Sequence, residues 1–128
     1  MSLLASAQNL YVRFRYPVSL PQDIGFALGI PISNYISFSE FIEFLLSNEC
    51  KPTKLTRFMS REKVEMAFEK AQKKELFHQH SLFSFYFNQG WLEFDLEFDA
   101  QSRLRRIHMH HKLILHPQGF ELVLPHIS

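Results

Sequence analysis

Hydrophobic and polar residues alternate through the C-terminal third of the chain, from Ser81 to Leu124. This period of two is typical of strands that bury one face, and it continues through four segments separated by turn residues. We therefore expect these segments to form a four-stranded antiparallel meander.

Three turns set the expected register: a two-residue turn at Gln89 and Gly90, a loop over residues 100–103, and a type I turn over residues 116–119. All three place the same apolar residues on one face, and a slip of one residue would expose the whole set. The expected cross-strand pairs are Phe83–Leu96, Phe85–Phe94, Phe87–Leu92, Leu96–Ile107, Phe94–Met109, Leu113–Leu122 and Leu115–Phe120.

The N-terminal part of the chain changes to helical spacing after a short alternating stretch. Alternation over residues 10–16 predicts a first strand. Three helices are then indicated by their capping residues. We expect one near Pro21–Leu28, capped by Ser19 and Gln22 and ended by Gly29, a second from the capping box of Ser37 and Glu40 to Asn48, and a third from Ser60 to about Lys74 with a Glu69–Lys73 pair.

These elements predict a two-layer α+β fold in which the N-terminal helices pack on a curved, mainly antiparallel sheet. The 128 residues are enough for one hydrophobic core, so we expect a single domain over residues 1–128. Phenylalanine accounts for 14 residues, which indicates either an aromatic core or a cavity lined by rings.

Charge and cysteine content limit both the classes of partner and the compartment that we expect for the protein. The formal net charge is +1, and the basic residues around Lys51, Lys54, Arg57 and Arg61 alternate with acidic ones. This pattern favours a solvated surface over binding to nucleic acid or to a membrane. The single cysteine, Cys50, and the lack of a long apolar stretch indicate a cytoplasmic protein.

The same register predicts which side chains lie on the outer face of the sheet. An acidic segment should lie beside a basic one there, and cross-strand ion pairs alone can explain this arrangement. Exposed aromatic residues among charges are also typical of contact surfaces. The expected interaction surface consists of Leu82, Tyr86, Trp91, Glu93, Asp95, His108, His110 and Val123, unless part of the same chain covers Trp91.

The sequence also allows two other kinds of site, a metal site and an apolar pocket. His108 and His110 project from one face beside Asp95 and Glu93, as in some metal sites, but a flat exposed face lacks a shell to orient the rings, so we expect no metal and no cofactor. The inner face offers a possible apolar pocket, although a ring-lined stripe is more often simply core. Its lining would be Phe41, Phe68, Phe85, Phe94 and His111.

Catalysis has little support in the sequence. The chain has four scattered glycines, no phosphate-binding loop and no nucleophile elbow. The expected function is a non-enzymatic protein-interaction or assembly module, self-associating as a homodimer through the outer sheet face. The alternative is a protein that binds a small apolar ligand or a metal.

Overall fold

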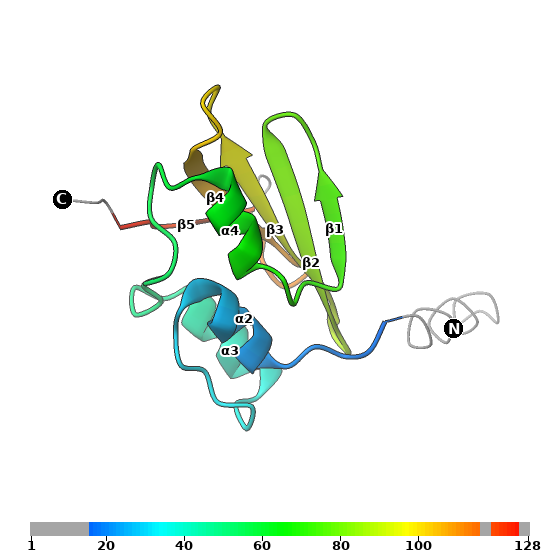
Figure 1. The fold of residues 1–128 in the computed structure, drawn as a ribbon. Helices are drawn as coiled ribbons and strands as arrows, with labels where there is room; N and C mark the ends of the chain where they lie inside the picture. Colours follow the sequence, from blue (N-terminus) through cyan, green and yellow to red (C-terminus); the bar gives the residue numbers. More distant parts are fainter. Residues whose placement is uncertain (1–15, 116–118, 126–128) are drawn as a thin grey trace.

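The computed structural model describes residues 16–115 and 119–125. Within them, three helices and a five-stranded antiparallel sheet form an α+β fold, and the sheet is open rather than closed (Figure 1). The helices are α2 (Pro21–Leu28), α3 (Phe38–Leu45) and α4 (Arg61–Ala67). The strands pair in sequence order as β1 (Lys73–Leu76), β2 (His80–Phe87), β3 (Gly90–Phe98), β4 (Leu104–His110) and β5 (Phe120–Leu122).

Helices α3 and α4 begin at the expected caps. The Ser37 hydroxyl accepts a hydrogen bond from the Glu40 amide at 3.2 Å and donates one to the Glu40 carboxylate at 2.8 Å. The Ser60 hydroxyl accepts one from the Lys63 amide at 3.4 Å. Both contacts satisfy amides that the first turn of a helix leaves unpaired.

The expected cap of α2 is wrong. Asp23 accepts the hydrogen bond from the Leu20 amide at 3.0 Å, in the role assigned to Gln22. Ser19 is instead buried, and its hydroxyl accepts a hydrogen bond from the Gln72 side chain at 3.0 Å. Ser19 therefore makes a tertiary contact instead of capping the helix. Gly29, with a φ of 76°, follows the helix as expected.

The third expected helix is too long. α4 ends at Ala67, and Lys73–Leu76 forms the edge strand β1 against β2. The expected pair with Glu69 does not form, and the Lys73 ammonium lies 3.3 Å from Glu75 instead. Pairing the edge of β2 satisfies its backbone groups, which outweighs the helix propensity of this segment.

The pairing of β2 with β3 differs from the expectation by two residues. The turn lies at Asn88 and Gln89, and Gly90, with a φ of 112°, follows it, so Phe83 faces Phe94. The glycine serves as the residue after the turn rather than within it, a common hairpin arrangement. Because the shift is two residues, every side chain stays on its expected face.

The pairing of β3 with β4 is confirmed, with Leu96 opposite Ile107 and Phe94 opposite Met109. The pairing of β4 with β5 is wrong by six residues, because Ile107 and not Leu113 faces Leu122. The chain turns after His110, where the Ile114 amide donates to the His111 carbonyl at 2.9 Å. Leu113 and Leu115 consequently point outward instead of into the core.

Two expected elements cannot be compared with the structure. The first strand, over residues 10–16, lies outside the described residues apart from Tyr16. The turn at residues 116–119 lies outside them apart from Gly119.

Phe68, which directly follows α4, lies at the centre of the hydrophobic core. Its ring stacks on Phe83 with the centroids 5.0 Å apart, and it contacts Phe94 at 5.4 Å and Phe85 at 6.4 Å. All four rings are buried. Figure 1 shows α4 in front of the strands, so this cluster joins the helical layer to the inner face of the sheet.

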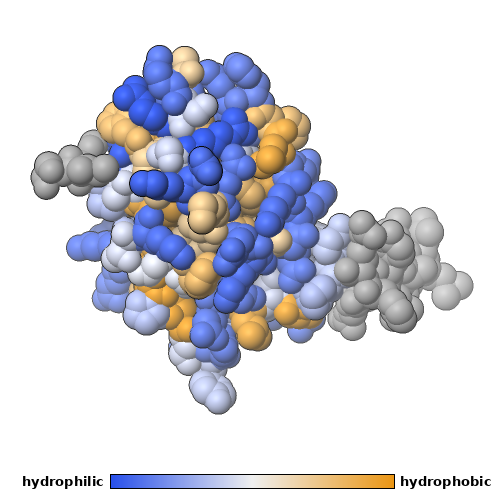
Figure 2. Space-filling view, viewed as in Figure 1, coloured by the Kyte–Doolittle hydropathy of each residue, from blue (hydrophilic) through white to orange (hydrophobic). Residues whose placement is uncertain are grey.

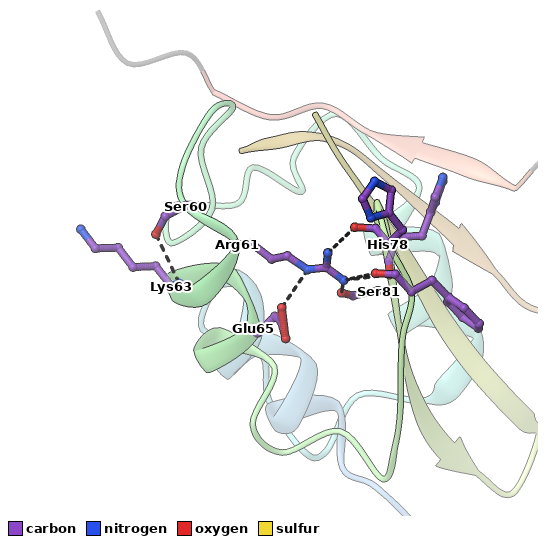
Figure 3. Close-up of polar contacts among 8 residues, drawn as sticks. Ser60, Arg61, Lys63, Glu65, His78 and Ser81 are labelled. Atoms are coloured by element: carbon purple, nitrogen blue, oxygen red, sulfur yellow. Dashed lines mark hydrogen bonds and ion pairs between the residues drawn. The ribbon is translucent and has the colours of Figure 1, made fainter. Parts of the chain in front are cut away.

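Arg61, at the start of α4, fixes the turn between β1 and β2 (Figure 3). Its guanidinium donates to the carbonyls of Phe77, His78 and His80 at 2.6, 2.7 and 3.1 Å, and to Glu65 at 2.9 Å. The group is largely buried, with 17% of the side chain exposed. These charge-assisted hydrogen bonds tie a helix to a β-turn.

The surface on the helical side is mixed. Figure 2 shows hydrophobic patches of the described residues in small areas separated by hydrophilic ones. Scattered patches of this size are normal for a folded chain and indicate no particular site.

Replacing the central ring should strongly destabilise the fold. We expect Phe68→Ala to lower the free energy of unfolding by about 3–5 kcal/mol, because it leaves a cavity among three other rings. Chemical denaturation measures the change. Met66→Ala in α4 is the control, since Met66 is 66% exposed, and it should change the free energy by less than about 0.5 kcal/mol. Equal effects of the two substitutions would contradict this role for Phe68.

Replacing Arg61 should loosen the turn that it holds. We expect Arg61→Met to keep the apolar stem but to cost about 1.5–3 kcal/mol, the range for hydrogen bonds to a charged group. Hydrogen exchange should become faster at the Phe77 amide, which donates to the His80 carbonyl at 2.8 Å. Lys63→Met, an exposed position in α4, should change neither property. Unaltered exchange at Phe77 in Arg61→Met would show that the turn is stable without the guanidinium.

Candidate functional site

The outer face of the sheet, on the side away from the helices, carries an acidic strand beside a basic one. β3 contributes Glu93, Asp95 and Glu97, while β4 contributes Arg106, His108 and His110. The observed pairs are Glu93–His110, Asp95–His108 and Glu97–Arg106, as the sequence predicted.

Contacts between these side chains are loose in most places. His80 Nδ1 lies 3.0 Å from Asp95 Oδ1, and this is a well-formed pair between β2 and β3. Arg106 lies 4.0 Å from both Glu97 and Glu121, at the outer limit of an ion pair. Its side chain remains 56% exposed. The face is therefore charged, partly exposed and only partly neutralised by its own pairs.

The shift of β2 changes what lies beside each site residue. Leu82 is opposite Asp95 rather than Glu97, and His80 takes the position next to Glu97. Leu82 is half-buried among these polar neighbours.

The aromatic end of the outer face is covered within the chain. Trp91 pairs with Tyr86, with ring centroids 5.2 Å apart, and Tyr16 packs edge-on against it at 4.9 Å. Tyr86 is only 8% exposed, and the Ser19 amide donates to its carbonyl at 2.7 Å. Trp91 therefore lies beyond the paired part of β3 and β4, which ends at Glu93 and His110.

Val123 lies outside the rows of the sheet, although it is 81% exposed. It follows β5, whose only outward residue opposite β4 is Glu121, paired with His108. The expected position of Val123 depended on the β4–β5 register that the structure corrects.

The two outer histidines do not form a metal site with their neighbours. Among the described residues, no group of three His, Cys, Asp or Glu side chains is placed to hold a metal ion. Asp95, one of the carboxylates beside these histidines, is already paired with His80.

The rings proposed to line an inner pocket form the core instead of an open space. Phe41, Phe68, Phe85 and Phe94 are fully buried and contact other rings. The pockets described below are lined by other residues.

His111 is the one polar residue expected to face inward, and it is 8% exposed. Its Nδ1 accepts a hydrogen bond from the Leu113 amide at 3.0 Å, so the neutral ring carries its proton on Nε2. Nε2 is buried without a hydrogen bond of normal geometry. Burial lowers the pKa of His111, the positive charge of Lys112 adds to this, and the Gln89 carbonyl acts in the opposite direction.

An apolar pocket of about 350 Å³ lies beside β5, at a place that the sequence did not indicate. Leu45 at the end of α3, Cys50, Phe120 and Leu122 contribute to its wall. Burial raises the pKa of the Cys50 thiol to about 11, so the thiol stays protonated at neutral pH and is a poor nucleophile.

A polar pocket of about 460 Å³ was also missed. It is lined by Arg57, Arg105, Arg106, His108 and Glu121. The run Arg103–Arg106 is a signal in the sequence, but strict alternation would turn Arg105 inward, whereas the structure leaves it exposed. The register between β3 and β4 shifts at Glu97 and Phe98, opposite the start of this run.

Comparisons with protein-family models, with curated proteins and with solved structures found no match. No helix in the described part of the chain is long and apolar enough to cross a membrane. The function must therefore be inferred from the geometry of these surfaces.

The buried His111 should make the fold less stable in mild acid. Its folded pKa is lowered from the ordinary value of 6.5, so below that pH the unfolded chain binds a proton that the folded chain resists. We expect the free energy of unfolding to fall as the pH drops from about 7.5 to about 5.5. Denaturation at both pH values measures this loss, which should be smaller in His111→Gln. The exposed His78 provides a control, because His78→Gln should keep the full pH dependence; equal dependence in both variants would contradict the assignment.

Proposed function

We propose that this chain is a cytoplasmic, non-enzymatic protein-interaction module that self-associates as a homodimer through the outer face of its sheet. The observation that carries the proposal is the juxtaposition of acidic β3 and basic β4 on a face that lies away from α2, α3 and α4. The central residues of this surface are Leu82, Glu93, Asp95, Glu97, Arg106, His108 and His110.

Two-fold symmetry fits such a face. In a symmetric dimer the same surface of both copies meets, so the acidic strand of one copy can lie against the basic strand of the other. Glu97 and Arg106 are neighbours within a copy, yet their contact is 4.0 Å and both side chains are substantially exposed. Each charge therefore has unused capacity for a partner in a second copy.

The chemistry of the single thiol gives no support to covalent catalysis, in keeping with a binding role. Cys50, the one thiol, has a pKa raised by burial, which is opposite to the change that a nucleophile needs. A single cysteine also fits a reducing compartment such as the cytoplasm.

Trp91 contributes less to the proposed surface than its outward position in β3 would suggest. Because Tyr16 and Tyr86 pack on it, replacing Trp91 would disturb the fold as well as any contact. Charge reversal at Glu97 and Arg106 is a cleaner test, since an exposed pair of this kind contributes at most about 1 kcal/mol to stability.

Two reversed variants should each be monomeric and should bind each other. Glu97→Arg makes this part of the face wholly basic, and Arg106→Glu makes it wholly acidic. In a symmetric dimer each variant alone brings like charges together, and we expect its dimer to weaken by at least about tenfold, or 1.4 kcal/mol. An equimolar mixture should restore a dimer with the mass of one copy of each, measured by light scattering and native mass spectrometry.

Glu43→Arg, at an exposed position of α3, is the control and should dimerise like the unaltered protein. A monomeric unaltered protein at all concentrations would refute self-association. A dimer that survives both single reversals would place the interface elsewhere.

A further inference from the structure

The polar pocket contains three guanidinium groups and one carboxylate. Arg57, Arg105 and Arg106 line it together with His108 and Glu121, where the loop before α4, the start of β4 and the end of β5 meet. Its volume of about 460 Å³ is within the range of small-molecule sites.

Arg57 is anchored through its backbone. Its backbone amide donates to the Pro125 carbonyl at 3.1 Å, which joins the loop to the chain after β5. The Nε atom of its guanidinium is buried and has no hydrogen-bond partner among the described residues. Arg57 also lines the pocket, and its guanidinium stays charged at any physiological pH, so it favours an anion there although Nε itself is covered by protein atoms.

Arg105 is oriented by an aromatic ring in a strained position. Its guanidinium carbon lies 5.0 Å from the centre of the Phe58 ring, within the range of a cation–π contact. Phe58 has a φ of 72°, and its amide donates to the Leu104 carbonyl at 2.7 Å. A left-handed conformation is unfavourable for an aromatic residue, and strain of this kind is concentrated at functional sites.

The charges in the pocket are unbalanced. Among the described residues, no carboxylate lies within 4.0 Å of Arg57 or Arg105, and Arg106 lies at that limit from both Glu97 and Glu121. Arg103 differs, because it binds Asp99 at 2.9 Å and the Arg103 hydrogen bonds help to lower the pKa of that carboxyl against the opposing effect of desolvation. The neighbouring arginine is thus neutralised, while those of the pocket are available.

From these observations we propose that the pocket binds the phosphate group of a small phosphorylated molecule. Guanidinium groups bind phosphate through paired hydrogen bonds, and a doubly charged phosphate would balance the excess of positive charge. A long polyanion fits less well, because the acidic residues Glu93, Asp95 and Glu97 of β3 lie on the same face and the net charge of the chain is only +1.

Inorganic pyrophosphate is a suitable probe, and the Arg57 Nε–H signal in a nitrogen–proton NMR spectrum is the readout. Titration at constant ionic strength, set with sodium chloride, should shift this signal along a saturable curve. Arg105→Gln should weaken binding by about tenfold, as expected for loss of a charged, paired contact. Lys74→Gln, in β1 at the opposite edge of the sheet, should leave the affinity unchanged.

A gain of affinity separates the proposal from a loss caused by misfolding. Glu121→Gln removes the carboxylate that competes with the phosphate, and we expect it to strengthen binding about threefold. Glu43→Gln changes the net charge of the chain equally at a distant site and should have no effect. Equal gains in these two variants, or the absence of a saturable shift in the unaltered protein, would overturn the proposal. Tighter binding of a single-stranded oligonucleotide than of pyrophosphate would overturn the assignment to a small molecule.

Discussion

The packing of Phe68 on the inner face of the sheet is the contact on which the architecture depends. The ring is fully buried and lies against Phe83, Phe85 and Phe94, so it joins the segment after α4 to both β2 and β3. Once these side chains face the helices, the alternation of a strand sends their sequence neighbours to the opposite face. The charged outer surface is therefore a direct consequence of where the aromatic rings are buried.

The faces of the strands could be predicted from the sequence, whereas the pairing between strands was predicted only in part. Alternation assigns a side chain to a face through local sequence alone, and this was sufficient for Phe94 and Asp95. The register depends on turn geometry, and Gly90 was expected within the turn, whereas it follows the turn. For β5 the error was larger, because the chain turns after His110, where the Leu113 amide donates to His111 Nδ1, and the alternation of Leu113 and Leu115 gave no sign of this turn.

The candidate surfaces also divide into features that local alternation predicts and features that depend on the whole fold. The acidic and basic positions of β3 and β4 followed from alternation and from a register that was correct. The covering of Trp91 by Tyr16, and both pockets, depend on segments distant in sequence that come together only in the fold. Arg61 shows why charge alone is a poor guide: a residue of the basic run is committed to backbone carbonyls, while Arg57 in the same run lines a pocket.

The short strand β1 has a further consequence for the behaviour of the protein in concentrated solution. Its Lys73 and Lys74 are exposed at the outermost edge of an open sheet, and the strand is four residues long. An unprotected edge can template the addition of strands from other molecules and lead to fibrous aggregates. Repulsion between lysines of successive molecules opposes such growth, so this edge discourages aggregation.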